Sequence, residues 1–159
     1  RRSSDLHDDA ESVAVLVNLG ADPNPTSSRQ PLHDAAFAGH ARTVEALLAA
    51  GASPDSFDQL PGAGGGATPL LAAISAGSTE CVRLLLAAGA NANLAAKSHE
   101  TPLHSAVARK SSPQARQVIV RMLLERGANP RTPGVDGKTP IELARQDGDP
   151  VLAKLFANR

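Results

Sequence analysis

One short phrase recurs four times along this chain of 159 residues. The phrase is Val, two residues, Leu, an aliphatic residue, two further residues and then Gly-Ala, and its copies begin at Val13, Val44, Val82 and Val120. A second phrase, Thr or Gln followed by Pro and an aliphatic residue, alternates with it and places prolines at Pro31, Pro69, Pro102 and Pro140. Internal repetition with a period of roughly 20–50 residues predicts a stacked array of similar units. Such a unit buries its apolar face only against its neighbours.

Each unit is predicted to hold two short helices. The threonine before the proline can cap the first helix with its hydroxyl group, and proline at the first helical position leaves no N–H group unpaired. A glycine nine positions after the Thr or Gln ends this helix, as at Gly39, Gly77 and Gly148. In the second helix, Val at i with aliphatic residues at i+3 and i+4 forms one apolar stripe. The helix ends at the Gly of Gly-Ala.

These phrases resemble the ankyrin repeat family, whose pattern joins Thr-Pro-Leu-His, a glycine turn, Val-x-x-Leu-Leu and Gly-Ala. The resemblance extends from about Leu6 to about Ala157. It implies an all-α ankyrin-repeat solenoid of stacked helix-turn-helix units with short β-turn fingers, about four and a half repeats in one domain over residues 1–159. The expected units are a half repeat at about 5–22, repeats at about 26–54, 63–92 and 96–130, and a C-terminal capping repeat at about 134–157.

Two insertions interrupt the period. The proline-to-proline steps are 38, 33 and 38 residues, whereas the family period is about 33. One insertion is the Gly-rich segment 60–67, which lengthens a finger, and the other is 111–115, which we expect between the two helices of its unit. Insertions of this kind indicate a natural chain and not a consensus design.

The two ends of the array are expected to differ. The first unit begins at its second helix, so Val13, Leu16 and Val17 would lack cover on one side, and we interpret the chain as a fragment of a longer protein. The last unit is expected to cap the stack. Its inward-packing residues would be Val151, Leu152, Leu155 and Phe156.

Charge and cysteine content narrow the possible partners and setting. Sixteen basic residues balance sixteen acidic ones, although residues 1–60 hold four basic and nine acidic residues. Nucleic acid is not expected as a partner, because no aromatic residue lies among the basic residues near the C-terminus to stack on bases. Arg116, Arg121 and Arg126 are instead expected on a solvated outer helix face. The single cysteine, Cys81, permits no intramolecular disulfide and favours an intracellular setting, and no apolar run is long enough to cross a membrane.

The sequence predicts no catalytic residue, cofactor or metal site. Residues 62–67 fit the G-x-G-x-x-A dinucleotide pattern, but that pattern requires a preceding buried strand, which is missing here. A zinc site needs three or four convergent ligands. Apart from His33 and His104, the chain offers only Cys81 and the scattered His7, His40 and His99, which lie on different units. The resemblance implies that His33 and His104 are structural, bonding with the cap hydroxyl group to neighbouring backbone. Cys81 is expected to be a small, partly buried core residue.

The resemblance implies a non-catalytic, monomeric domain that binds a protein partner in a concave groove, formed by the fingers and the first helices. Two alternatives remain open: a regulatory inhibitor of a kinase or transcription factor, and the substrate-recruiting arm of a larger enzyme such as a ubiquitin-ligase receptor. The groove residues carried over by position are Arg29, Phe37, Ala38, Phe57, Ser75, Ala76, Lys97, Glu100, Arg109, Asp136, Lys138 and Gln146.

The two aromatic members of this set each allow two interpretations. Phe37, between the small residues Ala36 and Ala38, is either an anchor for the partner or a residue packed beneath the neighbouring finger. Phe57 either holds the long finger against the stack or contacts the partner.

Overall fold

The computed structural model describes residues 10–25, 30–57, 66–109 and 112–157. Within these ranges the chain forms helices and turns without any β-strand, which confirms the predicted all-α class. The helices are α1 (Ala10–Asn18), α2 (Pro31–Ala38), α3 (Ala41–Ala49), α4 (Pro69–Ala76), α5 (Thr79–Ala87), α6 (Pro102–Ala108), α7 (Pro113–Glu125), α8 (Pro140–Asp147) and α9 (Pro150–Phe156).

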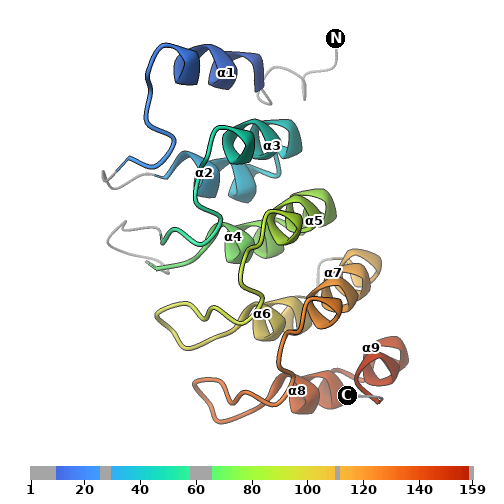
Figure 1. Cartoon of the computed structure of the whole chain (residues 1–159). Helices are drawn as coiled ribbons and strands as arrows, with labels where there is room; N and C mark the ends of the chain where they lie inside the picture. The colour runs from blue at the N-terminus through green and yellow to red at the C-terminus, as the bar shows by residue number, and fades with distance from the viewer. Residues whose placement is uncertain (1–9, 26–29, 58–65, 110–111, 158–159) are drawn as a thin grey trace.

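The helices stack in two rows that run the length of the molecule (Figure 1). The inner row contains α2, α4, α6 and α8, and the outer row contains α1, α3, α5, α7 and α9. Each inner helix packs against the outer helix that follows it and against the next inner helix, whereas α1 packs against α3. The connections that lead into α6 and α8 project on the left of Figure 1, away from the outer row. This arrangement confirms the predicted ankyrin-type solenoid.

Local signals in the sequence account for the ends of the inner helices. The hydroxyl groups of Thr68, Thr101 and Thr139 each accept a hydrogen bond from the backbone N–H three residues later, as predicted. Gln30, which replaces threonine in the first such unit, makes no cap bond and instead donates to the Pro25 carbonyl at 2.7 Å. Gly77 ends α4 at a φ of 72°, in the left-handed region that glycine adopts without steric cost.

Polar side chains also join the loops of successive units. The Asn24 amide donates to the Gly51 carbonyl at 2.9 Å and accepts from Ser53 N–H at 2.7 Å. Two units later, Asn93 makes the same pair of bonds to the Gly127 carbonyl and to Asn129 N–H, at 3.0 and 2.7 Å. These bonds fix one unit on the next at the loops, beside the buried residues Ala52 and Ala128.

The leucine of the repeated phrase forms the centre of the core, except in the first unit. Leu47, Leu85 and Leu123 are 4%, 0% and 0% exposed. Leu16, at the equivalent position in α1, is 56% exposed because no described inner helix pairs with α1. The expected lack of cover in the first unit is therefore confirmed for this residue.

The structure corrects three expectations about packing. The 111–115 insertion does not lie wholly between two helices: Ser112 caps α7 and Pro113 begins it, so part of the insertion lengthens this helix to 13 residues, against nine in α5. At the C-terminal end, Leu152 and Phe156 pack inward, but Val151 is 41% exposed. Cys81, expected to be partly buried, is fully buried. Most of the other insertion, residues 60–65, lies outside the described residues.

Candidate functional site

The C-terminal ends of the inner helices form a continuous row of exposed and half-buried residues across the stack. In α2, Leu32, Ala35 and Ala36 are buried, whereas Phe37 and Ala38 are exposed. Each of the four inner helices contributes two residues to this row, six and seven positions after its first proline. We call these eight residues the inner ledge. Its members are Phe37, Ala38, Ser75, Ala76, Ala108, Arg109, Gln146 and Asp147.

The two candidate aromatic residues are both accessible. Phe37 is 63% exposed. Most of the neighbouring finger, residues 58–65, lies outside the described residues, so both interpretations of Phe37 stay predictions. Phe57 is 37% exposed and lies at the edge of the described residues. Arg29, another candidate, lies outside the described residues.

The fingers before α6 and α8 are tight turns that carry four of the candidate side chains. In the first, Ala96 N–H donates to the Glu100 carbonyl at 3.0 Å, and His99 adopts a φ of 62°. In the second, Gly134 N–H donates to the Lys138 carbonyl at 2.8 Å. Both turns agree with the predicted β-turn fingers. The candidates on these fingers, Lys97, Glu100, Asp136 and Lys138, are exposed.

Two finger lysines are held against the stack. The Lys138 ammonium group donates to the Gln146 side-chain oxygen at 3.1 Å, so the structure brings these two candidate residues together. The Lys97 stem lies on Gly66, where an added Cβ would come within 2.5 Å of Lys97 Cγ. Aliphatic stems of this kind cover surface while the charged group stays in water.

His104 joins the finger before α8 to the unit that precedes it. Its ring is buried, and its Nδ1 accepts from Thr101 N–H at 3.2 Å and lies 2.8 Å from Thr101 Oγ1. With Nδ1 accepting, Nε2 carries the ring proton and donates to the Lys138 carbonyl at 3.1 Å. Both nitrogens are thereby used, so His104 has the structural role that the resemblance implied.

Arg109 extends from the end of α6 onto the preceding unit. Its guanidinium group donates to the Ser75 carbonyl and covers Gly77, where an added Cβ would lie 2.8 Å from Nη2. A positive charge at the C-terminal end of α4 also interacts favourably with the helix dipole. Two candidate residues, Ser75 and Arg109, therefore lie in contact.

Comparison with known proteins decides the family. A family model described as ankyrin repeats (three copies) matches residues 58–133, and a model for a single ankyrin repeat matches residues 29–59. The crystal structure of an ankyrin repeat domain from Acinetobacter baumannii AYE superposes with a TM-score of 0.81 at 31% sequence identity, covering 93% of this chain and 74% of that one. The chain belongs to the ankyrin repeat family.

Two curated relatives are also similar to this ankyrin chain. Ankyrin repeat and SOCS box protein 9 of Mus musculus is 37% identical over 123 residues, which cover 76% of this chain. The ankyrin repeat protein YahD of Escherichia coli (strain K12) is 43% identical over 56 residues, which cover 35% of this chain. The matches span 38% and 28% of the length of these relatives.

A buried arginine holds the C-terminal ankyrin repeat in place, which corrects the prediction of a solvated Arg116. The Arg116 side chain is 7% exposed, and its two terminal nitrogens lie 2.9 Å from Asp147 Oδ2 and 2.9 Å from Asp149 Oδ2. Gln117 also donates to Asp149, at 3.1 Å. The same carboxylate caps α9 by accepting from Val151 and Leu152 N–H. No sequence signal marked this cluster.

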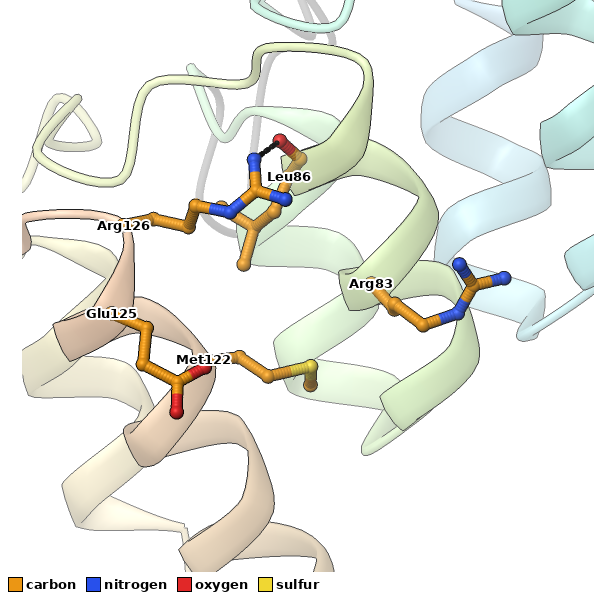
Figure 2. A pocket seen from close by; sticks show the side chains of 5 residues that line it. All are labelled: Arg83, Leu86, Met122, Glu125 and Arg126. Atoms are coloured by element: carbon orange, nitrogen blue, oxygen red, sulfur yellow. Dashed lines mark hydrogen bonds between the residues drawn. The ribbon is translucent and has the colours of Figure 1, made fainter.

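The other two arginines named with Arg116 are exposed, as predicted. Arg121 and Arg126 lie toward the solvent side of α7 and its C-terminal end. Arg126 also donates to the Leu86 carbonyl, so it caps the C-terminal end of α5 (Figure 2).

A hollow of about 150 Å³ lies beside this contact, between α5 and α7. It is lined by Arg83, Leu86, Met122, Glu125 and Arg126. In Figure 2 the Arg83 guanidinium group extends away from Arg126, toward α3, and it pairs with Glu80 of its own helix. The charged groups that line the hollow therefore do not converge on one point, as a ligand site would require.

The environment of Asp149 predicts that the C-terminal repeat loses stability in acid. The hydrogen bond from Gln117 lowers the pKa of Asp149 below its ordinary value of 3.8, assisted by Val151 and Leu152 N–H and by Arg116, against the opposing effect of burial. A lowered pKa in the folded state stabilises the fold above the unfolded-state pKa, and this stabilisation is lost as the pH falls through the folded-state pKa. We therefore expect a loss of stability below about pH 4.

The test is a thermal melt at several pH values for the wild-type chain and the Asp149→Asn variant. Asparagine keeps the helix cap but has no titrating carboxyl group. The variant is expected to be less stable at pH 7 and to lose less stability on acidification than the wild type. Parallel pH profiles for the two proteins would contradict the assignment.

The described residues show no other recognisable chemical site. None of them form a group of three or more His, Cys, Asp or Glu side chains that could hold a metal ion. Within the same ranges, no helix has the length and apolarity needed to cross a membrane.

Proposed function

We propose that this ankyrin chain is a non-catalytic protein-binding domain whose inner ledge and finger tips contact the partner. Ankyrin repeats are in general protein–protein interaction modules. The observation that carries the proposal is Phe37: a large apolar ring, 63% exposed, next to small side chains on a row that crosses every repeat. Aromatic residues with small neighbours are typical anchors in protein interfaces.

The mechanism is the presentation of a surface that is already ordered before binding. The helix caps, the His104 bridge and the asparagine bonds between loops hold each unit on the next. A partner that docks on a pre-ordered surface loses less conformational entropy than one that must order a flexible loop. The ledge itself therefore need not rearrange.

A substrate-recruiting arm of a larger enzyme is a second candidate. The observation that favours it is the similarity, over 76% of this chain, to a mouse protein named for both ankyrin repeats and a SOCS box. In this form of the proposal, the ankyrin repeats hold a substrate protein for an activity carried elsewhere. The intracellular setting and the monomeric state stay predictions.

The decisive variant is Phe37→Glu, paired with Val118→Glu as a control. Val118 is 42% exposed on the outer helix α7, so both changes place a carboxylate on an exposed apolar position. Each is expected to change stability by less than about 1 kcal/mol. Phe37→Glu alone is expected to weaken binding by at least about tenfold, because a charge replaces the anchor.

Affinity purification from cells, followed by binding measurements on the recovered partner, provides the readout. Thermal melts of both variants show whether each one folds. Equal binding by wild type, Phe37→Glu and Val118→Glu would place the partner elsewhere on the molecule and contradict the proposal.

A further inference from the structure

We propose that the inner ledge recognises a peptide segment in the polyproline II conformation, with an apolar side chain and a carboxylate three residues apart. The apolar side chain packs on Phe37, and the carboxylate pairs with the guanidinium group of Arg109. This inference rests on the proposed function and adds the chemistry of the partner to it. It follows from the shape, charge and spacing of the ledge.

The shape of the ledge is a low floor between two large side chains. Between Phe37 and the Arg109 guanidinium group, the ledge positions hold only alanine and serine. These small residues are Ala38, Ser75 and Ala76. A floor of small side chains leaves room for a peptide backbone to approach the helix ends closely. The next ledge position, Gln146, is longer and is already bonded to Lys138, so it closes the floor on that side.

Apart from the ion pair of Asp147 with Arg116, the ledge carries a single charge, and that charge is positive. Arg109 is the ledge's single cation, and its one carboxylate, Asp147, is paired with the buried Arg116 at 2.9 Å. The Ser75 carbonyl takes one of the five N–H donors of Arg109, which positions the guanidinium group. Because the Ser75 carbonyl is neutral, the guanidinium group keeps its full positive charge. That charge suits an acidic side chain, since arginine and carboxylate form strong paired hydrogen bonds. The anionic member of the motif follows from this complementarity.

The spacing follows from the packing of the inner helices. Arg109 belongs to α6, but its guanidinium group lies over the end of α4, next to Ser75 and Gly77. Phe37 lies on α2, which packs directly against α4. Packed helix axes are about 8–10 Å apart. A polyproline II segment advances about 3.1 Å per residue with three residues per turn, so its side chains at positions i and i+3 lie on the same face. The two anchors are therefore about three residues apart, with the acidic residue on either side of the apolar one.

Selection from a phage-displayed library of random 12-residue peptides tests the inference. On the wild-type chain, we expect selection of peptides that carry Asp or Glu three positions from an apolar residue. These should be enriched about fivefold over peptides that carry Lys or Arg at the same position, which is the effect of an exposed ion pair. The preference should fall at high salt, which screens the charges. Arg109→Gln should abolish the preference for the acidic residue while the apolar preference remains.

Matched variants separate a folding effect from recognition. Arg121→Gln removes an exposed arginine from the outer row and should leave the selected motif unchanged. Arg109 also caps α4, so Arg109→Gln could act through the fold. Arg109→Lys is therefore included, because lysine keeps the positive charge, and this variant should keep part of the acidic preference. Thermal melts accompany every selection.

The outcomes distinguish the two proposals. Two outcomes would overturn this inference and leave the proposed function standing. In the first, the selected peptides depend on Phe37 but show no preference for an acidic residue. In the second, the acidic preference is present but persists in Arg109→Gln. Selected peptides whose binding is unaffected by Phe37→Glu, or no selected peptides at all, would overturn the proposed function together with the inference.

Discussion

Replacing Arg116 with methionine is expected to destabilise the chain by about 3 kcal/mol, with the loss concentrated in the C-terminal repeat. Methionine keeps the aliphatic stem but removes the charge, so Asp147 and Asp149 are left without their cation. Removal of one partner from a buried ion pair costs more than the pair contributes, because the remaining charges stay partly desolvated. For a domain of this size the midpoint of thermal unfolding should fall by roughly 6–12 °C.

The control for this experiment is Arg121→Met, on the same helix. Arg121 is exposed, and replacement of such a surface residue typically changes stability by less than about 0.5 kcal/mol. Hydrogen exchange can locate the effect, with α8 and α9 losing protection first in Arg116→Met. An equal and small effect of both substitutions would show that the ion cluster does not hold the last repeat in solution.

Leu85→Ala and Leu16→Ala are expected to differ strongly although they change the same position of the repeated phrase. Leu85 is 0% exposed at the centre of the stack, and its truncation should cost about 3–4 kcal/mol through lost burial and the cavity left behind. Leu16 is 56% exposed on α1, so the same truncation there should cost about 1 kcal/mol or less. Urea unfolding of the three proteins measures the difference directly.

The slope of each urea transition serves as the internal check. Unchanged slopes for the wild type and both variants mean that the midpoints report stability alone. A cost at Leu16 as large as that at Leu85 would show that another segment covers α1 in solution, contrary to the exposure described above.

Features that depend on local chemistry could be predicted from the sequence. The Thr101 cap and the Gly77 turn were both foreseen, since each involves bonds or backbone angles within a few residues of the named position. The apolar stripe of α5 was predicted for the same reason, because its spacing follows from the helical period. The repeat then placed these elements in a stack.

Features that depend on contacts between distant residues could not be predicted. Arg116 meets Asp149 across 33 residues, and nothing near either residue marks the pair. The sequence likewise placed the 111–115 insertion between two helices, whereas Ser112 and Pro113 begin α7. The cap supplied by Ser112 is a local signal that could have been recognised.

The candidate site shows the same division. The sequence identified Phe37 and Arg109 as members of one exposed row, by their register in the repeat. It did not indicate that the Arg109 guanidinium group lies on the preceding repeat, over Ser75 and Gly77. That placement shortens the distance between an apolar anchor and a positive charge, and the proposed peptide motif depends on it.

The sequence by itself determined the repeat, its helix ends and the family, because register and helix capping depend on residues that are close together in the chain. Only the tertiary structure decided which charged side chains are available to a partner. Arg109 and Arg116 are both arginines near the turn between α6 and α7, yet one lies half-buried on the ledge and the other is buried among carboxylates. Their difference arises from which repeat each side chain reaches, and that follows from packing between units.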